Sequence, residues 1–420
     1  MHKKADLSNG LTLVYEKLPY VRSVSFGLWI GTGSRFETYE QNGISHFIEH
    51  MLFKGTETRS AKDIAMVIDS LGGQLNAFTG KECTCIYTKT LDEDLKTAVE
   101  LISDMLFHST FDPVQIETEK KVIVEEISMY KDYPEELVHD MLSEEVWSGH
   151  PLSYPILGSY ESVASITREK ILDYMNTFYV PENSVVSVAG NFDEQYLIDL
   201  VQKYFGDWKS SGISKFHEAK PWFNRSMKVK RKDTEQVHMC IGFPGIKHGE
   251  ESLYSLLAFN NILGGGMSSR LFQKVREELG LAYSIYSYAT SYKDVGMFVI
   301  YAASSPASFM DVIRHIRNEL ELVTGDCLTE EDVEKAKSQL KGNFIISLDS
   351  TSGRMNSMGK SQLMLGRVTT PEEVLESINR VSRDSIKEII DSIFKSAQVG
   401  FTAIGDVDFD PGILDKIGIR

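Results

Sequence analysis

The sequence contains little cysteine and no long apolar segment. Only 4 of its 420 residues are cysteine. We therefore expect buried free thiols, which are typical of a reducing compartment, and no disulfide framework. No stretch approaches the roughly 20 apolar residues of a membrane span. The first residues carry a basic patch with no apolar run behind it, unlike a secretory signal. We therefore expect a cytoplasmic protein that does not bind a membrane.

Positive charge is also scarce, with 44 Lys and Arg against 60 Asp and Glu and a net charge of −16. Because phosphate binding needs a basic face, nucleic acid is not an expected partner. The sequence has no Gly-x-Ser-x-Gly elbow, and its Gly264–Gly266 segment lacks the Gly-Lys-Ser/Thr ending of a phosphate loop. Serine hydrolysis and phosphate-loop chemistry therefore have no support.

Histidine is rare, yet two of the ten histidines fall in the segment 46–50, HFIEH. At about 100° per residue, a helix places His46, Glu49 and His50 on one face. The other face is an apolar stripe at the spacing of a buried helix: Ile44, Phe47, Ile48, Met51 and Leu52. Two imidazoles one turn apart suit a tetrahedral zinc ion, and Glu49 is placed to hold a water molecule. The pattern is H-x-x-E-H, the reverse of H-E-x-x-H.

A catalytic zinc usually takes a third protein ligand, and a second helix offers one. Asp112-Pro113 has the pattern of an N-cap followed by proline, which predicts a helix from Val114 to about Lys131. Glu119 and Glu126 lie seven positions apart on it and so share a face. Glu126 is the candidate ligand, and Glu119 is a candidate for orienting the site from behind. Spacing alone does not choose Glu126 over Glu125.

Four segments together resemble a known family. They are residues 43–56 (GISHFIEHMLFKGT), 72–79 (GGQLNAFT), 122–127 (VIVEEI) and 276–284 (REELGLAYS). The chain resembles the pitrilysin/insulinase-type inverted zincins, and most closely the processing-peptidase branch of half-length subunits. The distance from His50 to Glu126 matches the family's spacing, so the resemblance selects Glu126 as the ligand.

The resemblance implies one Zn²⁺ per chain, held by His46, His50 and Glu126. Glu49 would take a proton from the attacking water and pass it to the leaving amine. Arg276 and Tyr283 resemble the family's substrate-side pair, which would stabilise charge on the carbonyl oxygen. The segment 74–79 would be an edge strand onto which a peptide adds itself as a further strand. Its nearest substrate contacts would be Asn76, Ala77 and Phe78.

The expected fold is α+β with two duplicated domains, because the second half repeats the order of strands and helices of the first. Each domain is expected to be a mostly antiparallel sheet with helices packed on one face, forming half of a clamshell. We predict a zinc-binding catalytic domain at 1–210, a linker at 211–225, and a second domain without metal at 226–420. The predicted helix 252–263 of the second half carries no histidine.

The predicted function is a zinc metalloendopeptidase that cleaves peptides or unfolded segments inside a closed chamber. The main alternative is a catalytically silent subunit that supports a partner, although such subunits usually have a broken ligand set. A non-hydrolytic zinc module is a third hypothesis, but Glu49 argues against it, since a structural site has no use for a base. A peptide is the expected substrate, and the resemblance implies a homodimer, since half-length subunits of this family typically form dimers.

Overall fold

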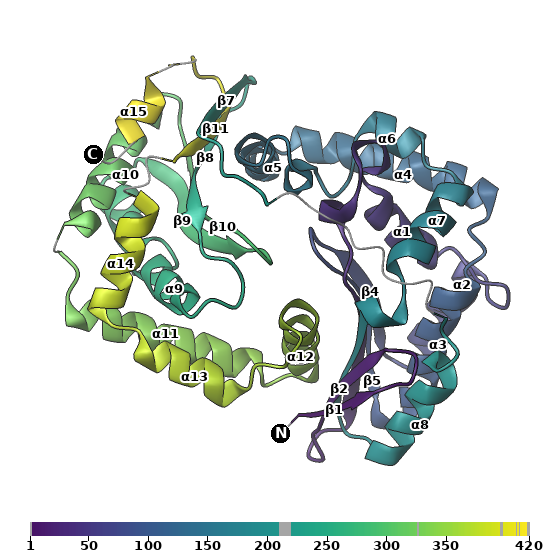
Figure 1. Cartoon of the computed structure of the whole chain (residues 1–420). Helices are drawn as coiled ribbons and strands as arrows, with labels where there is room; N and C mark the ends of the chain where they lie inside the picture. Colours follow the sequence, from purple (N-terminus) through teal and green to yellow (C-terminus); the bar gives the residue numbers. More distant parts are fainter. Residues whose placement is uncertain are drawn as a thin grey trace. The chain divides into compact units, whose positions relative to one another are not determined.

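The computed structural model describes residues 2–209, 220–325, 327–394, 398–408, 410 and 412–417 (Figure 1). The chain divides into two compact units. Unit 1 consists of Met1–Ser128, Tyr154–Glu218 and Ile346–Thr369, and unit 2 of Met129–Ser153, Ala219–Ile345 and Thr370–Arg420. Residues 211–219 of the predicted linker 211–225 lie outside the described residues. The remaining residues, 220–225, form no helix or strand.

Unit 1 contains a six-stranded sheet in the order β1-β2-β6-β3-β5-β4. All neighbouring strands pair antiparallel except β2 and β6, which are parallel. The strands are β1 (Lys3–Asp6), β2 (Thr12–Lys17), β3 (Ser23–Ile30), β4 (Gln74–Thr79), β5 (Thr84–Leu91) and β6 (Ser184–Gly190). The segment predicted to be an edge strand, β4, does lie at the edge of this sheet.

Unit 2 contains a five-stranded sheet in the order β7-β11-β8-β10-β9, in which only β7 and β11 are parallel. The strands are β7 (Ser226–Arg231), β8 (Val237–Gly245), β9 (Ala282–Ser291), β10 (Gly296–Ser304) and β11 (Gly400–Gly405). If β1 is left out and the strands of each sheet are numbered along the chain, both sheets have the order first, fifth, second, fourth, third. This shared topology confirms the predicted duplication, and it makes β9 the counterpart of β4.

Most helices of unit 1 cover one face of its sheet, where their apolar side chains share a single core with the strands. These helices are α1 (Ile44–Leu52), α2 (Ala61–Ser70), α3 (Leu95–His108), α4 (Pro113–Asp132), α6 (Tyr160–Ala164), α7 (Arg168–Phe178) and α8 (Glu194–Phe205). The opposite face carries α12 (Thr351–Leu365), which packs on β2, β3 and β6. Its buried Met355 and Met358 belong to one cluster with Trp29 of β3.

Unit 2 is built in the same way. One face of its sheet shares a core with most of its helices. The helices of this unit are α9 (Ser252–Leu263), the π-helix η6 (Phe272–Glu278), α10 (Phe309–Thr324), α11 (Glu330–Ser347), α13 (Pro371–Arg380), α14 (Arg383–Phe394) and α15 (Ile413–Ile417). The opposite face is covered by α5 (Pro134–Val146), which packs on β7, β8 and β11.

The predicted fold class is confirmed, but the two units do not coincide with the predicted domains. The sequence prediction divided the chain once, whereas each unit contains a segment from the other half. The segment of the first half that contains α5 belongs to unit 2, and the one that contains α12 belongs to unit 1. The physical reason is burial, because each of these helices covers a sheet face that would otherwise expose apolar side chains.

Two composition-based expectations can be compared with the structure. All four cysteines are free thiols, and Cys83, Cys85 and Cys240 are buried as expected, whereas Cys327 is half-buried. No helix among the described residues is long and apolar enough to cross a membrane.

Candidate metal centre

Helix α1 is anchored by its apolar stripe, as the sequence predicts. The five stripe residues are each at most 1% exposed: Ile44, Phe47, Ile48, Met51 and Leu52. Burying each such side chain contributes about 1.5–3 kcal/mol, so the orientation of the helix is firmly set. The opposite face therefore has to present His46, Glu49 and His50 on the other side of the helix.

The start of α1 is fixed by a buried carboxylate and a glycine. Gly43, the N-cap, has φ +91°, a conformation that residues with a Cβ rarely adopt. Glu37 is fully buried and accepts the N–H groups of Gly43 at 2.7 Å and Ser45 at 2.9 Å. It thus satisfies donors that a helix start leaves unpaired. Burial raises the pKa of Glu37, and these hydrogen bonds partly oppose that effect.

Helix α4 supplies the carboxylates. Asp112 accepts the N–H groups of Val114 at 2.9 Å and Gln115 at 3.1 Å, which confirms the predicted cap. The helix buries Ile116, Ile123 and Ile127 in the core of unit 1. This burial turns Glu119 and Glu126 toward α1, while Glu125 is exposed.

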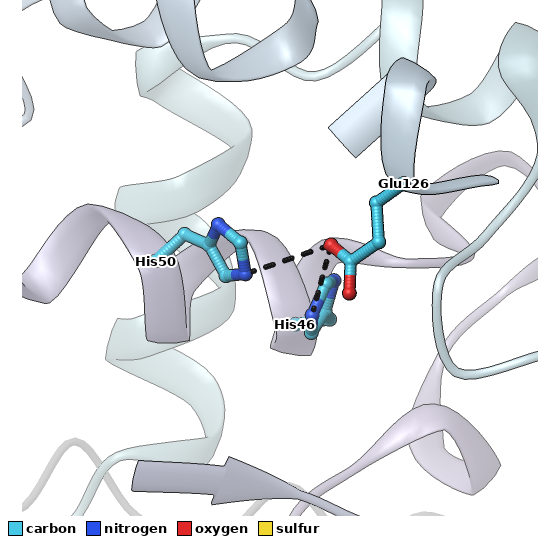
Figure 2. Close-up of side chains that lie close together, drawn as sticks. All are labelled: His46, His50 and Glu126. Carbon is cyan, nitrogen blue, oxygen red and sulfur yellow. Dashed lines mark ion pairs between the residues drawn. The ribbon is translucent and has the colours of Figure 1, made fainter. Parts of the chain in front are cut away.

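His46, His50 and Glu126 form a cluster between α1 and α4 (Figure 2). Glu126 Oε2 lies 3.9 Å from His46 Nε2 and 3.8 Å from His50 Nε2. One ligand atom from each residue lies within 4.8 Å of the other two. Among the described residues, no other group of three His, Cys, Asp or Glu side chains meets this condition.

The cluster fits a zinc ion by the chemistry and spacing of its donors. Separations of 3.8–3.9 Å are too long for hydrogen bonds between the three side chains. They leave room for one ion about 2.0–2.2 Å from each nitrogen and oxygen donor. Two imidazoles and one carboxylate are also the ligand set of known catalytic zinc sites with a fourth position left for water.

The two imidazoles are held differently. His50 Nδ1 lies 2.8 Å from Glu119 Oε1, so its N–H can donate there and leave Nε2 free for a metal. The other oxygen of Glu119 lies 2.7 Å from Lys54 Nζ. His46 Nδ1 is buried and has no hydrogen-bond partner among the described residues. Its ring is instead surrounded by protein, since His46 is only 8% exposed.

The surroundings also set the charge of these groups. Burial, together with the neighbouring His50, lowers the pKa of His46 to about 4, so its imidazole is neutral at pH 7. Burial alone would lower the pKa of His50, but the hydrogen bond and charge of Glu119 outweigh it and raise the pKa. Burial would raise the pKa of Glu119, but His50 and Lys54 outweigh it and keep the carboxylate ionised.

Glu49 lies beside the cluster without joining it. Its Oε2 accepts a 2.5 Å hydrogen bond from the hydroxyl of Thr79, the last residue of β4. Burial raises the pKa of Glu49, and the hydrogen bond from Thr79 and the charge of His50 oppose that rise. A half-buried carboxylate with a raised pKa, next to a possible metal site, suits a group that accepts and returns a proton.

The edge strand β4 passes next to this site. It pairs only with β5, so its other edge has no strand partner among the described residues. The side chains of β4 alternate between the two faces of the sheet, and Thr79 lies on the face that packs against α1. Phe78 is on the other face, with its ring 5.5 Å from that of Trp29. The N–H of Ala77 is donated to the Asn76 side chain at 2.9 Å.

The predicted substrate-side pair lies in unit 2, whereas all residues of the cluster lie in unit 1. The Arg276 guanidinium lies 5.9 Å from the ring centre of Tyr283 and 4.7 Å from that of Phe272. Tyr283 is 73% exposed. Arg276 also lines a cavity of about 380 Å³ that runs along β9 and the glycines 264–266.

Two contacts of the site were not predicted from the sequence. Thr79 and Lys54 both fall inside segments that carry the family resemblance, but their partners lie on other elements. A periodic pattern reports only which face of its own element a residue occupies. No local signal could have paired Thr79 with Glu49 or Lys54 with Glu119.

Comparison with known proteins bears on both halves of the chain. Residues 12–159 match the family described as insulinase (peptidase family M16), and residues 165–340 match the peptidase M16 inactive domain. The uncharacterized zinc protease YmxG of Bacillus subtilis is 45% identical over 394 residues, covering 94% of this chain and 96% of the relative. An uncharacterized zinc protease of Streptomyces coelicolor is 38% identical over 397 residues, covering 92% of this chain and 86% of the relative.

Two solved structures share the fold at low sequence identity. A protease from Helicobacter pylori superimposes with a TM-score of 0.89 at 21% identity, covering 96% of this chain and 99% of that one. A peptidase M16 inactive domain from Pseudomonas fluorescens gives a TM-score of 0.90 at 17% identity, covering 96% and 98%. The pairing of two such sheets in one chain is therefore an established architecture.

Proposed function

The chain belongs to the insulinase family, peptidase family M16, and we propose that it is a zinc-dependent endopeptidase. The observation that carries this proposal is the cluster of His46, His50 and Glu126, with Glu49 beside it. The names of its relatives support zinc and proteolysis at the level of the family. The complete ligand set supports activity in this particular chain.

In the proposed reaction, His46, His50 and Glu126 hold the metal. A bound zinc ion supplies Lewis acidity, which brings the pKa of a water it binds close to 7 and polarises a carbonyl oxygen. Glu49 accepts a proton from the attacking water and donates it to the leaving amine. Its position next to the cluster and its hydrogen bond from Thr79 suit both steps. Glu119 orients His50 through the Nδ1 contact.

We propose that the peptide binds as an added strand along the free edge of β4, near Asn76, Ala77 and Phe78. Backbone hydrogen bonds to an edge strand bind peptides of many sequences, and pockets for side chains set the preference. The Asn76 side chain now accepts the Ala77 N–H and would have to release it. Because β4 ends at Thr79, a peptide on this edge would run toward Glu49.

Arg276 and Tyr283 are proposed to act on the substrate from unit 2. A phenol and a guanidinium are suitable donors to the oxygen of the scissile carbonyl as it gains charge. Since the other functional residues lie in unit 1, this role requires a substrate enclosed between the two units in a closed chamber. We also keep a homodimer as part of the proposal, and the mass in solution tests it.

The experiment that tests the function is hydrolysis of an internally quenched fluorogenic peptide by the purified protein. We expect cleavage that a chelator abolishes and that stoichiometric zinc restores. Glu49→Gln should retain the metal but lose activity on the order of 10³-fold or more, because the proton acceptor and donor is removed. Zinc content is measured by elemental analysis in both proteins.

The silent-subunit alternative predicts a different result. If the protein binds one zinc ion per chain but cleaves no peptide, even when the protein is in excess over the peptide, the proposed endopeptidase activity is contradicted. That result would favour a supporting role. A Glu49→Gln variant with normal cleavage would contradict the role of Glu49 alone. A protein that takes up no zinc from a metal-replete buffer would contradict the metal site itself.

A further inference from the structure

Lys54 connects the end of α1 to a carboxylate of α4. The residue follows the helix closely, and its backbone N–H is donated to Met51 at 3.0 Å. Its Nζ lies 2.7 Å from Oε2 of Glu119, whose side chain is only 2% exposed. The other oxygen, Oε1, lies 2.8 Å from His50 Nδ1. The two oxygens of this buried carboxylate therefore face different groups: Oε1 meets a metal-site imidazole, and Oε2, which accepts no hydrogen bond from the described residues, is paired only with the Lys54 cation.

This arrangement makes the orientation of His50 depend on Glu119. The Nδ1 atom of His46 has no hydrogen-bond partner among the described residues, so His46 is oriented by packing alone. His50 is more exposed, with 25% of its side chain accessible against 10% for His46. Packing therefore restrains the His50 ring less than the His46 ring. The contact with Glu119 has to fix the orientation of His50 instead.

Glu119 is also a potential competitor for the metal. It lies seven residues before Glu126 on α4, so both carboxylates project from the same face of the helix. A carboxylate with a free oxygen can swing toward a divalent cation and add to its ligands. Lys54 holds the Oε2 oxygen and thereby keeps the carboxylate turned toward His50. Among the described residues Glu126 pairs with the two imidazoles and with no Lys or Arg, so its carboxylate remains the ligand.

We propose that Lys54 is a positioning residue of the metal centre, which fixes Glu119 behind His50 and so sets both the affinity for zinc and the choice of Glu126 as the third ligand. This inference rests on the proposed function, because it assumes that the cluster binds zinc. It assigns Lys54 no contact with substrate or metal. Its effect passes through Glu119 and His50.

The test is the zinc affinity of Lys54→Met, which keeps the length of the side chain and removes its charge. Affinity is measured by competition with a fluorescent chelator, independently of catalysis. Loss of the direct partner of a metal-binding histidine typically weakens metal binding about 10–100-fold, and because Lys54 acts through Glu119 we expect a loss toward the lower end of this range, about 10-fold. Lys54→Arg restores the cation and should stay close to the wild-type affinity. The visible spectrum of bound Co²⁺ should change in Lys54→Met, because Glu119 turns away from His50 and competes with Glu126 for the metal.

Lys120→Met is the matched control. Lys120 lies on α4 and forms an equally short ion pair, 2.7 Å to Glu117, which is not a residue of the candidate metal site. An unchanged zinc affinity in Lys54→Met, or an equal loss in Lys120→Met, would overturn the proposal. If the wild-type protein cleaves peptides with zinc while Lys54→Met binds zinc normally, only this inference fails. A wild-type protein that binds no zinc would overturn both this inference and the proposed function.

Discussion

The hydroxyl of Thr79 donates a 2.5 Å hydrogen bond to Oε2 of Glu49. One partner is the last residue of the edge strand β4, and the other lies on α1 between the two histidines of the candidate metal site. The strand proposed to receive the peptide is therefore tied directly to the group proposed to move the proton. This contact holds one oxygen of Glu49 in place and leaves the other available to a water molecule.

Thr79→Val should lower kcat without loss of zinc. A hydrogen bond to an ionised group contributes about 1.5–3 kcal/mol, so kcat is expected to fall by roughly 10–100-fold. Steady-state kinetics and zinc content are measured together. Thr88→Val in the neighbouring strand β5 is the control, because the buried Thr88 hydroxyl has no hydrogen-bond partner in the described part of the chain. Equal rates for Thr79→Val and the wild type would show that Glu49 needs no support from β4.

Glu126→Ala and Glu125→Ala should differ sharply in zinc binding. Glu126 lies within 4 Å of both imidazoles, whereas Glu125 is exposed on the same helix. Loss of a residue that hydrogen-bonds to a metal ligand weakens metal binding by up to about 10²-fold. Removing one of the three ligands themselves should weaken zinc binding by at least that factor. Metal content after dialysis against a weak chelator measures this. Retention of zinc by Glu126→Ala would identify a different third ligand.

Tyr283→Phe should reduce kcat by about 10²-fold and leave zinc content unchanged, because it removes one proposed donor to the carbonyl oxygen. The variant keeps the ring and so the contact with Arg276. Tyr20→Phe is a suitable control, since Tyr20 is equally exposed at 74% and lies in a turn of unit 1. Loss of zinc or of folding in Tyr283→Phe would argue for a structural role instead.

Met355→Ala should destabilise unit 1 although the residue comes from the second half of the sequence. Met355 is fully buried against the sheet with Trp29, and its truncation should cost about 2–5 kcal/mol. Met66→Ala on α2 is the control, because Met66 is 55% exposed and should change stability by less than about 0.5 kcal/mol. Chemical denaturation and hydrogen exchange of the β3 and β6 amides report the difference. Unchanged protection of these strands would mean that α12 contributes little to the core.

Much of the fold was predictable from local patterns. The helix predicted from Val114 to about Lys131 is α4 at Pro113–Asp132, and the predicted helix 252–263 is α9 with the same bounds. Both patterns are periodic and bounded by glycine or a cap, which a single chain segment displays by itself. The exchange of α5 and α12 was not predictable. The sequence of either helix does not indicate which of the two similar sheets its apolar face will cover.

The sequence by itself determined the face of α1 that carries His46, Glu49 and His50, because helical geometry follows from covalent structure and the apolar stripe sets which side is buried. Together with the family resemblance, it also indicated the chemistry. The family resemblance had selected Glu126 over Glu125, but only the tertiary structure placed it within 4 Å of both imidazoles and brought Thr79 to Glu49 and Lys54 to Glu119. These contacts join elements far apart in the chain, and their geometry depends on how the core packs α1, α4 and β4 together.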